Sequence, residues 1–229
     1  MSDTADLPVR DALPALTAAL RQRANAVLVA PPGAGKTTLV PLVLKDEPWA
    51  AGGKILLLEP RRVAARAAAA RMAALLGERV GQTIGLTTRL DRAVSEATRV
   101  EVVTEGLLVR RLQSDPGLDG VSAVLFDEAH ERNLDTDLAL ALCLDLQAGL
   151  RPDLRLLAMS ATLDARAFAA LMGDAPVIES LGRAFPVTIR HRAREIADPR
   201  EMPDAMAAAI REALAGHEGD VLAFLPGWG

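Results

Sequence analysis

Short apolar runs alternate with longer stretches of helical periodicity along most of this chain. Several runs are apolar throughout, and we expect strands at Ala26–Ala30, Lys54–Glu59, Arg99–Thr104, Ala123–Asp127, Leu154–Ser160 and Val177–Glu179. The expected helices are Val9–Arg23, Lys36–Leu44, Arg62–Leu76, Glu105–Gln113, Thr136–Gly149 and Ala165–Met172, with N-caps at Asp135 and Asp164. Strands that are apolar on both faces are typical of a parallel sheet covered by helices on both sides. The pattern predicts an α/β fold with a mostly parallel sheet flanked by helices.

The alternation restarts after about Leu181. Pro186–His191 is an expected strand, Pro203–Ala215 an Ala-rich helix and Asp220–Leu225 another strand. One strand–helix–strand unit cannot bury the faces of a parallel sheet by itself. We therefore expect a first domain over residues 1–182 and the truncated beginning of a second over 183–229, in a fragment of a longer protein.

Charge and composition exclude some classes of protein. The net charge of −4 argues against a chain coated in positive charge, so any nucleic-acid contact must come from a local basic patch. The single cysteine, Cys143, cannot form an internal disulfide and is expected to be buried. With no secretory signal at the N-terminus and no apolar stretch of about eighteen residues, no membrane association is expected and the cytoplasm is the predicted location.

The segment Ala30–Thr38 (APPGAGKTT) follows an apolar run and opens an expected helix. This is the context that a phosphate-binding loop requires. Gly33, Ala34 and Gly35 would shape a concavity whose backbone N–H groups point at phosphate oxygens, at the positive end of the helix dipole. Lys36 would reach the β- and γ-phosphates of a nucleotide, Thr37 would ligate Mg²⁺, and Thr38 would complete the loop. The alternative is a Gly/Pro turn with a solvated Lys36, and Ala30 replaces the first glycine of the usual pattern.

Two adjacent carboxylates, Asp127 and Glu128, end another apolar strand and are followed by Ala129, His130, Glu131 and Arg132. Buried carboxylates are costly unless they meet a cation, and open α/β sheets bind ligands at this end of their strands. Asp127 and Glu128 would hold Mg²⁺, and Glu128 would orient or deprotonate an attacking water. In the alternative interpretation the same residues form a polar strand cap with a surface salt bridge to Arg132.

Six segments in order carry a resemblance to the DEAH-box helicases of superfamily 2. They are Ala30–Thr38, Glu59–Ala65, Thr104–Gly106, Asp127–Arg132, Ser160–Thr162 and Phe224–Gly227. The resemblance implies a RecA-like P-loop NTPase domain followed by the start of a second one, with ATP and Mg²⁺ as cofactors. The catalytic residues would be Lys36, Asp127, Glu128 and His130.

The resemblance also implies contacts with a single strand of nucleic acid, RNA being the family's substrate. Arg61, Arg62 and the Thr104-Glu105-Gly106 segment would bind its sugar–phosphate backbone, which fixes position without reading sequence. Arg71 would stack on the adenine. Ser160 and Thr162 would link the γ-phosphate, through His130, to closure of two domains.

Family members complete the ATP site with arginines from a later segment, and no such run of arginines is present in these 229 residues. Such arginines contribute a factor of about 10³–10⁵ to hydrolysis in related enzymes. We therefore expect this chain to bind nucleotide, hydrolyse it slowly and not unwind duplexes.

Two other functions stay open at this point. The chain could be a P-loop NTPase that remodels a target other than nucleic acid, or a non-catalytic nucleotide-binding scaffold. Retention of Lys36, Thr37, Asp127 and Glu128 argues against the scaffold. The residues alone do not distinguish RNA from DNA as the substrate. They also do not define the pathway, the unwinding polarity, the nucleotide preference or the oligomeric state.

Overall fold

The computed structural model describes residues 7–131, 133–161, 165–182, 186–191, 196 and 198–224. The chain divides into two compact units, Met1–Ala184 and Phe185–Gly229. Among the described residues, no helix has both the length and the apolarity needed to cross a lipid bilayer.

The first unit is built on one sheet with the strand order β4-β3-β5-β2-β6-β7-β1-β8. The strands are β1 (Asn25–Val29), β2 (Lys54–Leu58), β3 (Ile84–Thr87), β4 (Arg92–Ala93), β5 (Val100–Val103), β6 (Val121–Phe126), β7 (Arg155–Ser160) and β8 (Val177–Glu179). Every described pairing is parallel except that of the short β4 with β3. The predicted mostly parallel α/β sheet is confirmed.

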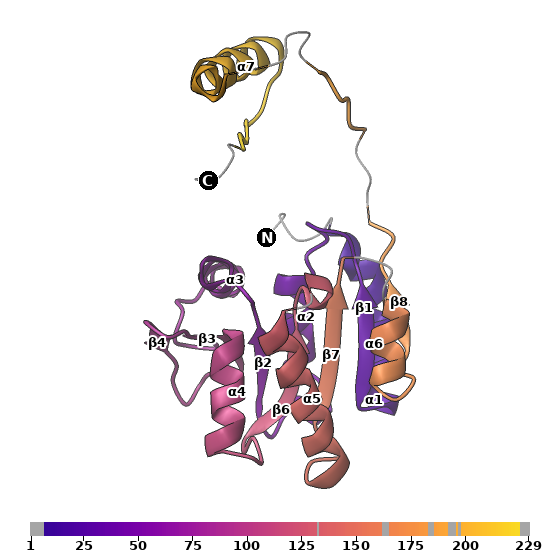
Figure 1. Ribbon diagram of the computed structural model, residues 1–229. Helices are drawn as coiled ribbons and strands as arrows, with labels where there is room; N and C mark the ends of the chain where they lie inside the picture. Colours follow the sequence, from indigo (N-terminus) through magenta and orange to yellow (C-terminus); the bar gives the residue numbers. More distant parts are fainter. Residues whose placement is uncertain are drawn as a thin grey trace. The chain divides into compact units, whose positions relative to one another are not determined.

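Helices cover both faces of the sheet. The elements are η1 (Pro8–Ala12), α1 (Leu13–Gln22), α2 (Lys36–Leu44), η2 (Pro48–Ala50), α3 (Arg62–Leu75), α4 (Glu105–Ser114), η3 (Ala129–Glu131), α5 (Leu134–Gly149) and α6 (Ala165–Leu171). Side chains of α1, α2 and α3 share a core cluster with one face, and those of α4, α5 and α6 share a cluster with the other. The second set lies in front of the sheet in Figure 1.

Alternation along each strand explains the two clusters. In β2, Ile55 and Leu57 belong to the cluster of α1–α3, while Leu56 and Leu58 belong to the cluster of α4–α6. Successive side chains of a strand point to opposite faces, so a strand covered on both faces must be apolar throughout. This requirement explains the apolar runs of central strands such as β1 and β2. Six of the eight strands were predicted from the sequence.

Cys143 is fully buried on α5, as predicted. Burial raises the pKa of its thiol to about 12, because the apolar surroundings disfavour the thiolate. The residue therefore acts as a small hydrophobe of the core.

Two kinds of local prediction fail in the first unit. The strands β3 and β4 were not predicted, since β3 is four residues long and contains Gly85. The predicted N-cap Asp135 is inside α5, whose N-cap is Asn133; the Asn133 side chain accepts a hydrogen bond from the Asp135 N–H. Asn133 is the N-cap in place of Asp135 because its amide oxygen reaches the N–H of the second helical residue. The other predicted N-cap, Asp164, lies outside the described residues.

The second unit contains η4 (Pro199–Glu201) and α7 (Met202–Gly216), and the predicted helix is confirmed. The predicted strand Pro186–His191 is wrong, and residues 220–224 of the other predicted strand are not in a strand either. These residues are exposed, and the part of this unit that the structure describes offers them no neighbouring strand. An apolar run alone does not make a strand, because its backbone groups need a hydrogen-bonding partner.

The buried centre of the sheet allows a test of the fold. Leu57 is 0% exposed, so Leu57→Ala should lower the free energy of unfolding by about 2–5 kcal/mol. Leu90 is 70% exposed, and Leu90→Ala should change it by less than about 0.5 kcal/mol. Urea unfolding followed by circular dichroism measures both. Equal effects of the two substitutions would contradict the described core.

Candidate functional site

The predicted site residues follow the carboxyl ends of five neighbouring strands. In sheet order these strands are β5, β2, β6, β7 and β1, and their ends form the upper edge of the sheet in Figure 1. Thr104 follows β5, Arg61 and Arg62 follow β2, Asp127 follows β6, and Ala30 follows β1. The topology thus brings distant segments of the sequence to one edge, with the Asp127–Glu131 turn in the middle.

The loop between β1 and α2 has the shape expected of an anion-binding turn. Gly33 and Gly35 both have positive φ, +76° and +91°, a conformation that glycine adopts at little cost. A Cβ on Gly35 would also lie 2.8 Å from Leu7 Cδ1, whereas a Cβ on Gly33 would meet nothing within 4 Å. Helix α2 begins at Lys36 without a side-chain cap. Its first N–H groups are therefore available to an anion.

Lys36 is buried, with 4% of its side chain exposed, and its Nζ lies 2.9 Å from Glu128 Oε1. This ion pair joins the β1 loop to the turn after β6. Glu128 has φ +50°, which is uncommon for a residue with a side chain. Its other carboxylate oxygen, Oε2, lies 3.4 Å from His130 Nδ1. The structure therefore brings three of the four predicted catalytic residues into contact.

Asp127, the fourth predicted catalytic residue, is almost completely buried. Its Oδ1 accepts a hydrogen bond from the Glu128 N–H at 2.9 Å, while its Oδ2 has no hydrogen-bond partner among the described residues. Burial raises the pKa of this carboxyl, and the charge of Glu128 adds to the effect; the Thr37 hydroxyl and Lys36 oppose it. A buried carboxylate oxygen without a partner is what a bound cation would satisfy.

Glu59, at the end of β2, belongs to the same cluster and was not among the predicted site residues. It is buried, and desolvation, followed by the charge of Asp127, raises its pKa to about 8. Its N–H donates to the Val103 carbonyl, and the N–H of Asp127 donates to the Leu58 carbonyl. The signal was available in the sequence, because Glu59 ends an apolar run just as Asp127 does.

The residues present fit a magnesium ion held together with a nucleotide. Among the described residues, no group of three or more His, Cys, Asp and Glu side chains could hold a metal by itself. Mg²⁺ usually takes one or two carboxylates, and substrate phosphates and water complete its octahedron. Asp127 Oδ2 and the neighbouring Thr37 hydroxyl supply such a partial set.

Arg61 and Arg62 are exposed at the start of α3, beside this cluster. Arg61 Nη2 lies 2.6 Å from Glu131 Oε1. Arg66, one turn further along α3, is ion-paired with Asp91 of the β3–β4 turn. Thr104 is the N-cap of α4 and Gly106 lies in the first turn of that helix. The Thr104 side chain makes no capping hydrogen bond. Positive charge and a helix start without a side-chain cap therefore meet on the β5–β2 side of the edge.

Glu105 occupies a different place from the other residues predicted to bind nucleic acid. Its side chain is buried and accepts a hydrogen bond from the Thr136 hydroxyl of α5. Burial raises the pKa of its carboxyl, and the charges of Asp135 and Glu131 act in the same direction. This carboxyl joins α4 to α5, so it positions Thr104 and Gly106 from within the protein.

The remaining predicted residues are less closely gathered. Thr38 donates from its hydroxyl to the Gly35 carbonyl. Ser160 is buried at the end of β7, and its carbonyl accepts from the Ala30 N–H at 2.9 Å. Arg71 is exposed on α3, nine residues and about 13 Å along the helix from Arg62. Thr162 lies outside the described residues.

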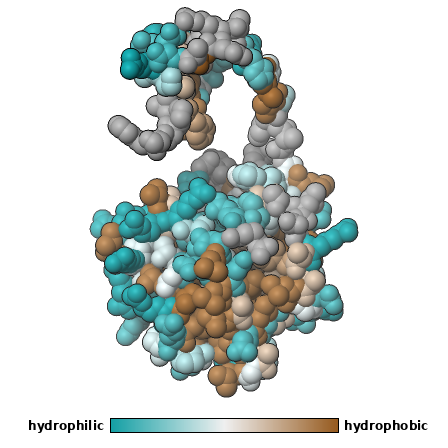
Figure 2. Space-filling model, in the orientation of Figure 1, coloured by the Kyte–Doolittle hydropathy of each residue, from teal (hydrophilic) through white to brown (hydrophobic). Residues whose placement is uncertain are grey.

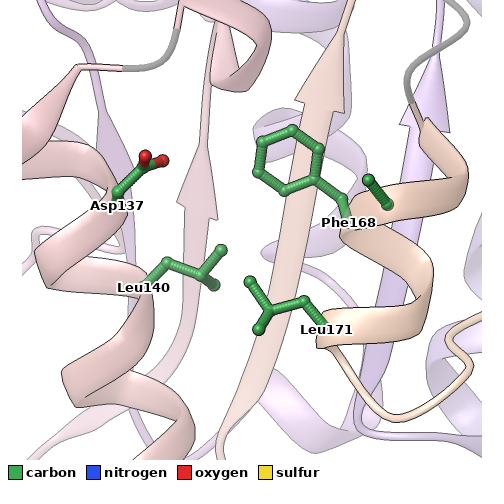
Figure 3. A pocket seen from close by; sticks show the side chains of 5 residues that line it. Asp137, Leu140, Phe168 and Leu171 are labelled. Atoms are coloured by element: carbon green, nitrogen blue, oxygen red, sulfur yellow. The ribbon is translucent and has the colours of Figure 1, made fainter.

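A hollow of about 170 Å³ lies apart from this edge, between α5 and α6. In Figure 3 the side chains of Leu140, Phe168 and Leu171 point toward one another from the two helices, with Asp137 at the rim. Hydrophobic side chains gather over α5 and α6 in Figure 2. None of the predicted site residues that the structure describes lines this hollow.

The sequence profile of the DEAD/DEAH box helicases matches residues 10–171 of the chain. The chain belongs to the DEAD/DEAH box helicase family. It is 49% identical over 223 residues to the ATP-dependent RNA helicase HrpB of Escherichia coli (strain K12), covering 97% of this chain and 27% of that protein.

Solved structures agree with this assignment. The crystal structure of the E. coli DEAH/RHA helicase HrpB matches with a TM-score of 0.86 and 49% identity, over 97% of this chain and 28% of that one. A structure of the E. coli DExH-box NTPase HrpB matches with a TM-score of 0.78 and the same identity, over 98% and 27% of the two chains. This helicase-family chain thus has the RecA-like fold expected from its motifs and spans about a quarter of the length of its relatives.

The position of Glu59 generates a prediction about pH. Its folded pKa is about 8 against 4.5 for a free side chain, so the folded state holds a proton that the unfolded state releases between these values. The free energy of unfolding should therefore fall as the pH rises from 4.5 to 8. Glu59→Gln should flatten this decline, since the amide does not ionise.

Urea unfolding between pH 5 and pH 8, with a chelator and no divalent cation, measures the effect. The raised pKa of Asp127 changes the free energy of unfolding in the same direction in both proteins. The difference between the wild type and Glu59→Gln therefore reports on Glu59. Parallel pH profiles for the two proteins would show that Glu59 does not hold the proton.

Proposed function

We propose that this chain is the ATP-binding part of an ATP-dependent RNA helicase. It would bind ATP with Mg²⁺ on the loop after β1 and the turn after β6, and the backbone of single-stranded RNA on the neighbouring edge. The observation that carries the proposal is the contact between Lys36 and Glu128 across 2.9 Å. It joins the anion-binding loop to a general-base candidate at the carboxyl edge of the sheet, where open α/β folds bind their ligands.

Each residue at this edge has a separate task in the proposal. The backbone of Gly33–Gly35 cradles the phosphates, and Lys36 binds the β- and γ-phosphates as a point charge. Thr37 and Asp127 hold the magnesium ion, which neutralises charge on the phosphates when bound. A γ-phosphate must displace Glu128 from Lys36, and the released carboxylate can then orient or deprotonate the attacking water.

Coupling to a second domain is the role proposed for the segment Ser160–Thr162. The Ala161 N–H donates to His130 Nδ1 at 3.3 Å, which ties the end of β7 to the acidic turn. Ser160 and Thr162 would transmit the state of the γ-phosphate through this connection. The proposed domain boundary is residue 183. The cytoplasmic location stays a prediction from sequence.

RNA is the proposed substrate because HrpB is named as an RNA helicase. Arg61, Arg62, Thr104 and Gly106 would bind phosphate and sugar groups, with Glu105 holding that loop in place. Backbone contacts of this kind carry little sequence information, so we expect low base specificity. The adenine contact proposed for Arg71 rests on the family resemblance alone.

Nucleotide binding is tested by substitution at the loop. Lys36→Ala should weaken binding of a fluorescent ATP analogue by about 10–100-fold, the loss expected for a charge-assisted hydrogen bond. Lys45→Ala is the matched control, since Lys45 pairs with the adjacent Asp46 away from the site and should leave binding unchanged. Removal of Mg²⁺ with a chelator should weaken binding of the wild type. Equal affinities for all three proteins would contradict the proposal.

RNA binding is tested by charge reversal. Arg62→Glu should weaken binding of a labelled uridine dodecamer by about tenfold or more and leave RNA-free ATP turnover unchanged. Arg79→Glu reverses an exposed arginine beyond the far end of α3 and should have a smaller effect. ATP turnover with and without the dodecamer should be measured for this chain and for a version extended by the part that longer relatives carry. Equal loss for both reversals would favour a target other than RNA.

A further inference from the structure

Arg61 reaches from the proposed RNA edge to the turn that carries the acidic residues. Its Nη2 lies 2.6 Å from Oε1 of Glu131, the last residue of η3. The Arg61 side chain is 72% exposed and that of Glu131 is 35% exposed. A guanidinium that faces solvent from a proposed phosphate-binding position is thus already occupied by a carboxylate of the protein.

Among the described residues, three side-chain contacts tie the turn at Glu128, His130 and Glu131 to other segments. Glu128 is ion-paired with Lys36, His130 accepts from the Ala161 N–H, and Glu131 is ion-paired with Arg61. The Glu131 N–H also donates to the Glu128 carbonyl at 2.9 Å, so the two glutamates are linked through the backbone. Two connections lead to the nucleotide side of the edge, and the third leads to the RNA side.

The surroundings of Glu131 make the third connection sensitive to Arg61. Glu131 is close enough to Glu105 to raise the pKa of that carboxyl, and Asp135 has the same effect. Among the described residues, Arg61 is the cation that is ion-paired with Glu131 beside these acidic groups. If Arg61 turned toward another anion, Glu131 would lose this ion pair while the like charges of Glu105 and Asp135 stayed close, which destabilises the end of the turn.

We propose that Glu131 is a positioning residue that competes with an RNA phosphate for Arg61 and so couples RNA binding to the nucleotide site. The inference rests on the proposed function. Without RNA, the Arg61–Glu131 pair anchors the turn in the form that keeps Glu128 on Lys36. A phosphate binds a guanidinium bidentately and releases counter-ions, so it takes Arg61 from an exposed and weakly held pair. The turn then loses its anchor, and Lys36 becomes easier for a nucleotide to occupy.

A second ion pair on the same helix provides a matched control. Arg66 and Asp91 have similar exposure, 50% and 42%, and join α3 to the β3–β4 turn. Among the described residues, the hydrogen-bonding partners of Asp91 are Arg66 and the Thr88 segment, and none of them belongs to the acidic turn. Glu131→Gln and Asp91→Asn both neutralise one carboxylate beside an arginine of α3, but only Glu131→Gln removes an anchor of the acidic turn.

The experiment measures two affinities for the full 229-residue chain. Binding of a fluorescent ATP analogue with Mg²⁺ is titrated without RNA, and binding of a labelled uridine dodecamer is titrated by anisotropy. Both neutralised variants should bind the dodecamer about 2–5-fold more tightly, because each loses a negative charge near the arginines. Glu131→Gln should also bind the nucleotide about threefold more tightly than wild type in the absence of RNA, whereas Asp91→Asn should not.

A charge swap separates coupling from loss of charge. The double variant Arg61→Glu with Glu131→Arg can restore the ion pair, so its RNA-free nucleotide affinity should return to the wild-type value while its RNA affinity falls. Equal nucleotide affinities for Glu131→Gln, Asp91→Asn and wild type would overturn the role of Glu131. A wild-type chain that binds the nucleotide but not the dodecamer would instead overturn the proposed function, and the inference with it.

Discussion

The parallel pairing of β7 between β1 and β6 is the constraint on which the rest of the site depends. Val29 is in register with Ser160, and Phe126 is in register with Ala158. The same pairing continues past the strand end, where the Ala30 N–H donates to the Ser160 carbonyl. Because all three strands point the same way, the loop after β1 and the turn after β6 emerge at one edge. Lys36 and Glu128 meet because only one strand, β7, separates β1 from β6.

The electrostatic state of this edge follows from that geometry. Lys36 is the one cation buried there among the described residues, and it faces Glu59, Asp127 and Glu128. Desolvation raises the pKa of Glu59 and Asp127, and Asp127 Oδ2 has no hydrogen-bond partner among the described residues. Such an arrangement costs stability in the absence of a ligand and is typical of sites prepared for a cation and an anionic substrate. The strained φ of Glu128 belongs to the same trade of stability for preorganisation.

Local sequence predicted elements well where local forces decide them. Helix α2 begins and ends where predicted. The phosphate-loop pattern determines where it starts, and its apolar face determines how long it is. The apolar run at 54–59 predicted β2 to within one residue, since burial on both faces demands it. By contrast, β3 and β4 are short strands at one end of the sheet, and their stability comes from the pairing of β3 with β5 and of β4 with β3. The wrong strand at 186–191 has the same cause, because a strand exists only with a partner.

The sequence by itself determined which residues could carry the chemistry: the loop at 30–38, the carboxylates Asp127 and Glu128, and the arginines that begin α3. These signals are contiguous, so residue type and spacing are sufficient to reveal them. Only the tertiary structure decided that Glu59 joins the carboxylate cluster, that Glu105 is buried against Thr136, and that Arg61 is held by Glu131. Those contacts join segments distant in sequence, and their existence depends on the strand order β5-β2-β6-β7-β1, which no local pattern encodes.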